Sequence, residues 1–231
     1  MKKKNFLFAA LTLAALSAGL VSCESDNLKD SSKNHEWVDL GLSVKWATCN
    51  VGATKPEEYG DYYAWGETEP KTNYNWSTYK WCSGSAETQT KYCTNSDYGT
   101  VDNKTVLELA DDAARANWGG AWRMPTDAEW TELLENCEWT WTTLNGVNGY
   151  EVTGTNGNFI FLPAGGMRYD NLEDAGMDGA GNYGVYWSSS LCTDYYSVFA
   201  WCVYFDLDGM SGHCGGDDGR ANGLSVRPVL K

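Results

Sequence analysis

Apolar residues occupy every second position in the segment that follows residue 36. The alternating positions are Val38, Leu40, Leu42, Val44 and Trp46, with smaller or polar residues between them. A period of two is typical of a strand that buries one face, so the pattern predicts a half-buried strand within residues 36–51. A second strand-like run, 59–65, follows a turn at Lys55-Pro56.

Residues 66–100 are polar and contain few aliphatic side chains, with aromatic residues at intervals. This composition predicts a long loop rather than a packed element. We expect a hairpin within it, between Asn73 and Cys93.

Helical spacing of apolar residues begins after this loop. It predicts a first helix over residues 106–114 and onward, which Gly119-Gly120 would end. A second helix is predicted from Thr126 to about Cys137. Thr126 is a favourable N-cap, and Glu129 three residues later completes a capping box.

Short strand-like runs fill the rest of the chain. Three of them are separated by Asn-Gly turns at 145, 148 and 156, which favour tight hairpins. The predicted strands are 139–143, 149–153, 159–162, 199–207 and a closing strand at 224–229. This order predicts an α+β domain with two helices, several short antiparallel strands and long irregular loops.

The first 22 residues form a separate unit. A basic start at residues 2–4 precedes an apolar run that is too short for a stable membrane span and predicts a secretion signal. Its end, Leu20-Val21-Ser22-Cys23, resembles a bacterial lipobox, which implies lipid attachment to Cys23; an ordinary signal peptide with a chance cysteine is the alternative. We therefore expect a lipoprotein signal peptide (1–22), a lipid-anchored tether (23–35) and one domain (36–231), held on the outer membrane of the cell envelope and exposed at the surface.

Charge narrows the choice of partner. The chain has 17 Lys plus Arg and 31 Asp plus Glu, a formal charge of −14, and removal of three signal-peptide lysines gives 14 − 31 = −17. Because nucleic-acid affinity comes largely from cations that neutralise phosphates, nucleic acid is excluded as an expected partner. No stretch after the signal is apolar enough to span a bilayer, so the lipid is the only expected membrane contact.

Cysteines give no clear plan for metal binding or disulfides. After Cys23 is lipidated seven cysteines remain, an odd number, so not all can pair within one chain. Cys82 and Cys93 could close a hairpin, while Cys49 and Cys137 could be buried thiols or a bridge. The chain has no C-x-x-C and only two histidines, so no metal site is expected.

Several short motifs are spread over about residues 36–230. They are Val38-Asp39-Leu40-Gly41-Leu42, Trp46-Ala47, Asn50-Val51-Gly52-Ala53, Tyr63-Ala64-Trp65-Gly66-Glu67, Trp122-Arg123-Met124-Pro125-Thr126, Trp130, Leu162-Pro163-Ala164-Gly165-Gly166, Tyr186-Trp187-Ser188-Ser189-Ser190 and Ser225-Val226-Arg227-Pro228-Val229. Together these motifs resemble a known family, the Fibrobacter succinogenes major paralogous domain. That family is related to formylglycine-generating enzymes and to C-type lectin-like folds, which implies a C-type lectin-like fold for this chain. Its relatives include the variable proteins of diversity-generating retroelements, whose ligand-binding surface is mutated through template adenines.

Residue usage in the last quarter of the chain fits that resemblance. Randomising the adenines of an AAY codon can never yield Lys, Glu, Gln, Trp or Met. Residues 23–173 hold 8 Lys, 14 Glu and 1 Gln among 151 positions. At the same rate, residues 174–230 would hold about 9 Lys, Glu and Gln residues in all. They hold none. Trp187 and Trp201 must then be fixed scaffold positions. The alternative is a set of tight turns and buried strands, which also disfavour Lys and Glu.

The alternation within 199–208 predicts which side chains meet a ligand. Phe199, Trp201, Val203, Phe205 and Leu207 share the face expected in the core, and the other face, with the loop 209–222, is expected to bind ligand. Exposed tyrosines and adaptable polar groups suit a diversified binding surface, here within about 190–222. The predicted ligand-binding residues are Tyr195, Tyr196, Cys202, Asp206, Asp208, His213, Asp217, Asp218 and Arg220.

We expect a binding module for a protein or glycan ligand, without cofactor or catalytic residues. Asp206-Leu207-Asp208-Gly209 is an incomplete calcium loop, because it lacks further acidic ligands. One alternative is an enzyme of the formylglycine-generating type that uses a cysteine pair among Cys192, Cys202 and Cys214. Another is a structural cell-envelope protein.

Overall fold

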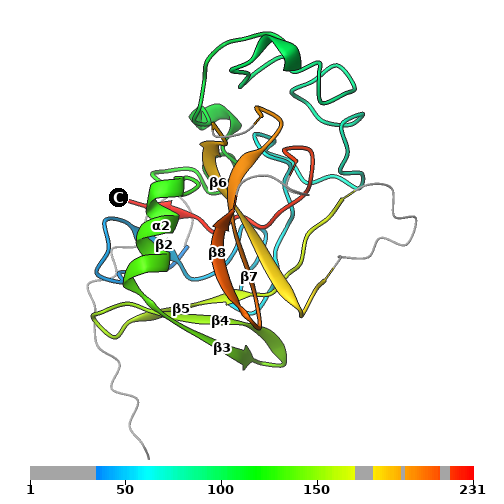
Figure 1. Cartoon of the computed structure of the whole chain (residues 1–231). Helices are drawn as coiled ribbons and strands as arrows, with labels where there is room; N and C mark the ends of the chain where they lie inside the picture. The colour runs from blue at the N-terminus through cyan, green and yellow to red at the C-terminus, as the bar shows by residue number, and fades with distance from the viewer. Residues whose placement is uncertain (1–34, 170–178, 194–195, 214–218) are drawn as a thin grey trace, which may run out of the picture.

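The computed structural model describes residues 35–169, 179–193, 196–213 and 219–231. It confirms the mixed class: few helices accompany small antiparallel sheets (Figure 1). Within the described ranges three sheets occur, with strand orders β1-β2-β9, β3-β4-β5 and β6-β7-β8. Their strands are β1 (Trp37–Val38), β2 (Lys45–Ala47), β3 (Glu138–Leu144), β4 (Val147–Thr153), β5 (Phe159–Pro163), β6 (Tyr183–Leu191), β7 (Ala200–Asp206), β8 (Gly209–His213) and β9 (Val229–Leu230).

The first sheet joins both ends of the domain. Trp46 of β2 pairs with Val38 on one side and with Val229 of β9 on the other. The prediction of one strand across 36–51 is therefore wrong: a turn separates β1 from β2, and Gly41 in it has φ +78° while its N–H donates to Asp39 Oδ1. The predicted strands at 59–65 and 224–229 reduce largely to one bridge, Tyr63 with Leu224, and to β9.

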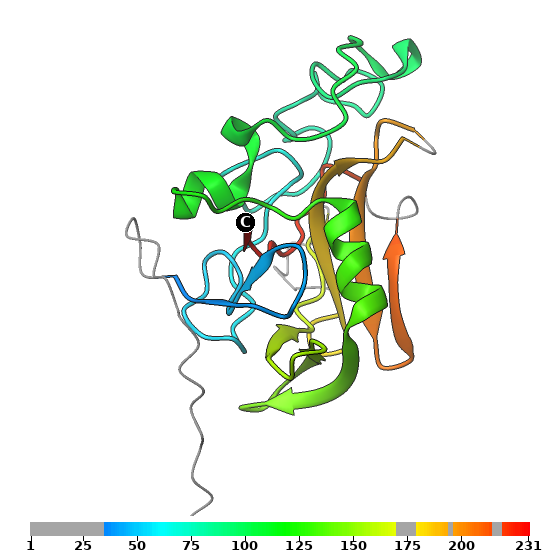
Figure 2. The same ribbon diagram turned by 90° about the vertical axis from the view of Figure 1, so that its left-hand side faces the viewer.

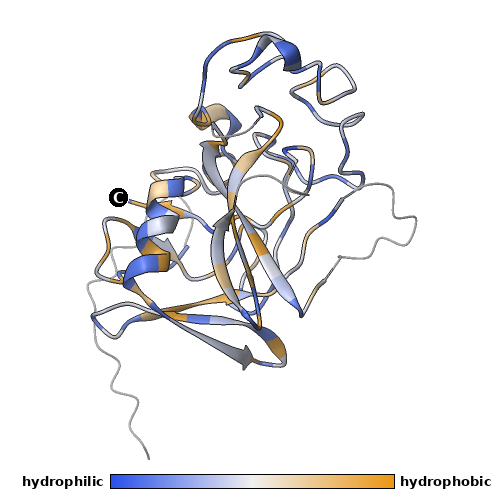
Figure 3. Cartoon of the chain, viewed as in Figure 1, coloured by the Kyte–Doolittle hydropathy of each residue, from blue (hydrophilic) through white to orange (hydrophobic). Residues whose placement is uncertain are grey.

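Helix α2 (Asp127–Asn136) confirms the second predicted helix and its capping box. Thr126 Oγ1 accepts from the N–H of Glu129 at 3.2 Å, and the Glu129 carboxylate accepts from the N–H of Thr126 at 2.8 Å. Figure 3 shows hydrophilic and hydrophobic residues alternating along this helix, as expected for a helix with one buried face. The buried residues are Trp130 and Leu133.

The first predicted helix is shorter than expected. A 3-10 turn, Leu109–Asp111, precedes α1 (Ala113–Trp118). The side chain of Asp112 caps α1 by accepting from the N–H of Arg115 at 2.9 Å, so the helix starts after it. Gly119 is the C-cap, as predicted.

The β3-β4-β5 sheet confirms three predicted strands. Its first hairpin turns at Asn145 and Gly146, which both have positive φ, and the second turns at 154–158. The predicted turn at 148 is wrong, because Asn148 and Gly149 lie within β4, where Gly149 pairs with Thr142. A Cβ on Gly149 would lie 2.3 Å from the carbonyl oxygen of Leu162, so glycine allows the close approach of two strands.

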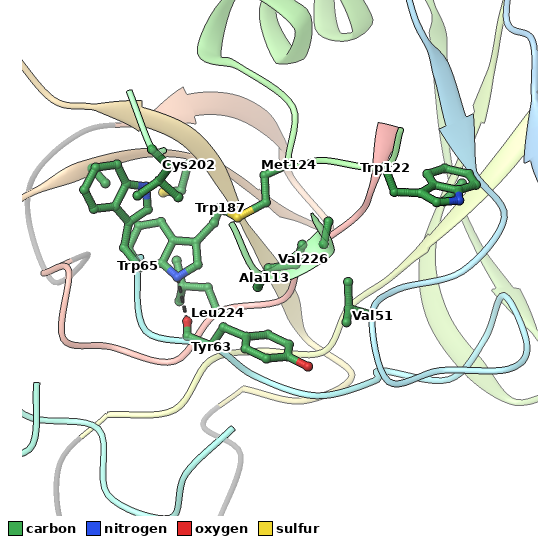
Figure 4. Close-up of a cluster of buried hydrophobic side chains, with 14 of the residues drawn as sticks. Val51, Tyr63, Trp65, Ala113, Trp122, Met124, Trp187, Cys202, Leu224 and Val226 are labelled. Atoms are coloured by element: carbon green, nitrogen blue, oxygen red, sulfur yellow. Dashed lines mark hydrogen bonds between the residues drawn. The ribbon is translucent and has the colours of Figure 1, made fainter. Parts of the chain in front are cut away.

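In the β6-β7-β8 sheet, β6 and most of β7 are buried, whereas β8 is a partly exposed edge strand. Neither β6 nor β8 was expected. On one face Tyr186, Val203 and Phe205 pack in a core with α2 and the β3-β4-β5 sheet. On the other face Trp187, Ala200 and Cys202 join a second core with α1 and the chain termini. Figure 4 shows Cys202 within this second core, where Trp187 Nε1 donates to the carbonyl oxygen of Tyr63 at 2.8 Å.

Residues 66–100 form the predicted long loop, which carries a short 3-10 turn at Ser96–Tyr98. The hairpin expected between Asn73 and Cys93 reduces to one bridge between Cys82 and Gln89. A small aromatic core, which includes Tyr62, Tyr74, Tyr79 and Ala221, lies beneath part of this loop.

The described cysteines that are free thiols include Cys49, Cys82, Cys93 and Cys137. The suggested Cys82–Cys93 bridge is therefore absent, and Cys49 is a buried thiol. Cys192 is disulfide-bonded. Cys214 and the lipidation residue Cys23 lie outside the described residues.

The described residues begin at His35, the last residue of the predicted tether. His35 stacks on Trp118 with ring centroids 3.7 Å apart and meets Trp122 edge-on at 6.4 Å. The predicted signal peptide and the rest of the tether lie outside the described residues. Among the described residues, no helix has the length and apolar character needed to cross a bilayer.

Candidate ligand-binding site

Some of the predicted ligand-binding residues are accessible, some are buried, and some lie outside the described residues. Tyr196 and Asp208 are exposed, as a ligand-binding role requires. Asp206 is half-buried, and its carboxylate accepts hydrogen bonds from Tyr204 Oη and from the N–H groups of Asp208 and Gly209. The backbone of His213 ends β8 opposite Cys202. The residues that lie outside the described ranges are Tyr195, Asp217 and Asp218.

The prediction that Cys202 contacts ligand is wrong, because this residue is only 2% exposed. It lies in β7, the central strand of its sheet, so a second core covers the face that was expected to meet a ligand. Ala200 lies on the same face of β7 as Cys202 and is buried in the same core. The face that was expected to lie in the core is only partly buried. Leu207 is 67% exposed in the β7–β8 turn, and Trp201 is half-buried.

The prediction that Arg220 contacts ligand is also wrong, because Arg220 is fully buried. Its guanidinium satisfies its donors within the protein, and it lies 5.0 Å from the ring centroid of Trp65. The arginine thus holds the long loop and the 196–199 segment against the C-terminal segment. Its acceptors are Tyr79 Oη (3.0 Å), Gln89 Oε1 (2.8 Å), and the carbonyl oxygens of Lys91 (2.9 Å), Tyr92 (2.9 Å) and Ser197 (2.7 Å).

A cleft of about 200 Å³ lies between α2 and the edge of the β6-β7-β8 sheet. Helix α2 packs against all three strands of that sheet (Figure 2), and the cleft opens where β8 carries Gly212. A Cβ on Gly212 would lie 3.9 Å from Leu134 Cδ1 and 4.0 Å from the ring of Trp201. The lining residues are Asp127, Trp130, Thr131, Leu134, Ser188, Trp201, Cys202, Val203 and Gly212.

The polar groups of the cleft are held in place by short hydrogen bonds. Ser190 Oγ donates to Asp127 Oδ1 at 2.7 Å, which fixes the carboxylate at the first turn of α2. Ser188 Oγ accepts from the N–H of Ser190 at 3.1 Å. Thr131 is exposed. The cleft therefore presents an indole wall, a fixed carboxylate and hydroxyl groups, the mixture of apolar area and few polar groups that is typical of ligand sites.

Aromatic residues of the long loop lie beside the predicted variable segment. Tyr196, 53% exposed, lies against Tyr98 of the long loop with centroids 5.3 Å apart. Phe199 bridges to Gly219, and a Cβ on Gly219 would lie 3.4 Å from the ring of Trp76. The long loop thus contributes aromatic area next to the predicted variable segment, a contribution that sequence reasoning missed.

Several residues of the quoted motifs have structural roles. Tyr186 Oη donates to the carbonyl oxygen of Pro163 at 2.8 Å and accepts from Asn50 Nδ2 at 3.2 Å. Burial raises the pKa of Tyr186 to about 12 and lowers the pKa of Arg227. These residues stabilise the core and do not form part of the cleft.

The chain matches no family model, no curated protein and no solved structure. Among the described residues, no group of three or more His, Cys, Asp or Glu side chains is arranged to hold a metal ion. A second hollow, of about 280 Å³, lies beside β1 and the turn before β5, and contains none of the predicted ligand residues.

Proposed function

We propose that this chain is a lipid-anchored binding module of the cell envelope, with a C-type lectin-like fold, which recognises a protein or glycan ligand through its C-terminal face. The observation that carries the proposal is the absence of Lys, Glu and Gln from residues 174–230. That segment supplies β7, β8 and the cleft wall formed by Trp201 and Gly212.

Exposure within the segment supports diversification of its surface. Tyr196, Asp208, Ser211 and Gly212 are exposed, and all four residue types can arise from a randomised AAY codon. Trp201 cannot arise that way, so it serves as a fixed aromatic wall beside changeable positions. A constant aromatic anchor with adaptable neighbours resembles the division of labour in evolved binding surfaces.

The arrangement of the ends supports display on a membrane. In Figure 2 the N-terminal strands and the C-terminus lie on one side of α2, and β8 lies on the other. A tether that leaves from residue 35 would therefore start on the side away from the cleft. The element order, with two α-helices and short antiparallel strands in the described ranges, is compatible with the lectin-like fold.

Diversification is tested by sequencing the 3′ end of the gene in sister isolates. We expect substitutions confined to codons 190–222 and derived from adenines, with codon 201 constant. Substitutions scattered evenly along the chain would defeat diversification.

Ligand binding is tested with the purified mature chain on glycan and protein arrays. We expect a ligand whose binding is lost when Tyr196 is changed to Ala, with Tyr169→Ala as the control, because Tyr169 is also exposed, at 39%, but precedes the segment. A structural cell-envelope protein would bind nothing on either array.

The anchor is tested at Cys23. We expect Cys23→Ser to move the protein from the membrane fraction to the soluble fraction and to abolish incorporation of labelled palmitate. Retention of label in the variant would contradict the lipid site.

The enzyme alternative would need a reactive cysteine pair. Of its three candidates, Cys192 is disulfide-bonded and Cys202 is buried, so the described residues lend it no specific support. Serine substitutions at 192, 202 and 214 that preserve ligand binding would exclude a role for these thiols.

A further inference from the structure

In the described part of residues 174–230, the exposed charged side chains are all acidic. Between residues 174 and 230 the only cations other than histidine are Arg220 and Arg227, and both are fully buried. Like Arg220, Arg227 donates its hydrogen bonds to oxygen acceptors inside the core. The acidic residues of the segment are Asp174, Asp178, Asp194, Asp206, Asp208, Asp217 and Asp218.

The cleft has the same imbalance. Among the described side chains, Asp127 is the only acidic residue in the cleft lining, and no Lys or Arg lines it. Asp127 receives a hydrogen bond on Oδ1 from the neutral Ser190, and among the described residues no Lys or Arg forms an ion pair with its carboxylate. Arg123, the nearest cation in sequence, is engaged by Glu129 instead, through Nη1 at 2.8 Å.

The wall opposite the helix adds a second attraction for a cation. The face of an indole ring carries negative potential and binds guanidinium or ammonium groups, with tryptophan the best aromatic partner. Trp201 is half-buried and lines the cleft together with Asp127. A carboxylate and an indole in one partly enclosed cleft attract a positive group with an apolar stem more strongly than either would alone.

We propose that the cleft between α2 and the β7–β8 hairpin binds an arginine or lysine side chain from a basic segment of a protein partner. The proposal rests on the proposed function, and it names the chemical class of the ligand. Charge complementarity carries it: a partner approaching a chain with net charge −14 is favoured when it is basic and repelled when it is acidic.

The experiment uses a hexa-arginine peptide and a hexa-citrulline peptide of the same length. Citrulline has nearly the shape of arginine without its charge. Binding to the mature chain is measured by calorimetry at 150 mM salt. We expect the arginine peptide to bind and the citrulline peptide to bind at least about tenfold more weakly, as loss of a desolvated cation–π and charge pair would produce.

Two variants locate the binding. Asp127→Asn keeps the hydrogen bond from Ser190 and removes the charge, while Gly212→Val fills the mouth of the cleft from a strand position that tolerates a branched side chain. We expect each to weaken the arginine peptide about tenfold. Glu135→Gln is the matched control, because it removes the same charge from an exposed position of the same helix outside the cleft lining, and it should have little effect.

The outcomes separate the two proposals. Equal weakening by Asp127→Asn and Glu135→Gln, or equal binding of both peptides, would overturn the cleft as a cation site. Binding of a neutral glycan that depends on Gly212 but not on the charge of Asp127 would also overturn it, and would leave the binding module standing. Failure of both the arrays and the arginine peptide would count against the proposed function itself.

Discussion

Arg227 Nε donates a 2.8 Å hydrogen bond to Oδ1 of Asn50, a residue 177 positions earlier in the chain. The same guanidinium donates to the carbonyl oxygens of Ala47 and Phe161, both at 2.9 Å. One buried side chain therefore links the sheet that joins the chain ends to the β3-β4-β5 sheet. Because Asn50 also donates to Tyr186, the pair couples β6 to both.

Replacing Asn50 by Ala should destabilise the domain by about 1–3 kcal/mol, because buried donors of Arg227 and the acceptor of Tyr186 lose a partner. Urea unfolding followed by tryptophan fluorescence measures the change. Asn136→Ala is the control, since Asn136 is exposed and donates only to the Glu132 carbonyl oxygen, and it should stay within about 0.5 kcal/mol of the native chain. Equal effects of the two changes would refute the coupling role of Asn50.

Arg220→Lys should cost at least about 3 kcal/mol, because a single ammonium cannot reach the separate acceptors that the planar guanidinium satisfies. Amide hydrogen exchange should rise in residues 89–93 and 196–199, which the arginine joins. Arg168→Lys is the matched control, because Arg168 is half-buried and its cation lies over the ring of Tyr62 at 4.9 Å, a contact that lysine can keep. Unchanged exchange in the Arg220 variant would contradict the anchoring role.

Glu129 should make stability fall in acid. Burial of its carboxyl opposes ionisation, but hydrogen bonds from Arg123 and Thr126 outweigh burial and hold its pKa below the ordinary 4.5. A carboxyl whose pKa is lowered by folding stabilises the native state above the unfolded pKa, and this contribution is lost as pH falls through the folded pKa.

The comparison is with Glu129→Gln, which keeps the capping geometry but removes the charge. At pH 7 the variant should be less stable by about 1–3 kcal/mol, and the difference should shrink below pH 4.5. Urea midpoints between pH 7 and pH 3 give the difference directly. A constant difference over this range would exclude Glu129 as a source of acid sensitivity.

Thiol labelling should follow burial. Burial raises the pKa of Cys49, and Cys93 and Cys202 are also buried, whereas Cys82 is half-buried. Iodoacetamide at pH 8 should therefore modify Cys82 in the native chain and leave the other three unmodified until urea is added, since thiolate formation and access control the rate. Mass spectrometry of peptides reads out each site, and early labelling of Cys202 would show that its sheet face is open.

The features that sequence predicts well are local. The capping box of α2 depends on Thr126 and Glu129, three residues apart, and it forms as expected. Strand β6 escaped prediction because its run of serines, Ser188–Ser190, has the composition of a loop. In the structure these serines are buried, and the backbone of Ser189 is paired with Pro125 and Leu107.

The candidate site was only partly predictable because burial there is set by distant segments. Alternation along 199–208 assigns two faces but cannot reveal that a second core covers the face of Cys202. Likewise, an arginine in a glycine-rich segment suggests exposure, whereas Arg220 finds its acceptors in residues 79–92 of the long loop. The cleft joins α2 to β8, and no local pattern links these two elements.

The stack of His35 on Trp118 has a mechanical consequence. We expect a force applied through the N-terminal segment to enter the domain at this aromatic contact and then at the two-residue strand β1, which within the described ranges pairs only with β2. Because β2 is also paired with β9, the force would act on both ends of the domain before it reaches α2 or the cleft. We therefore expect the first sheet to yield before the cleft changes shape.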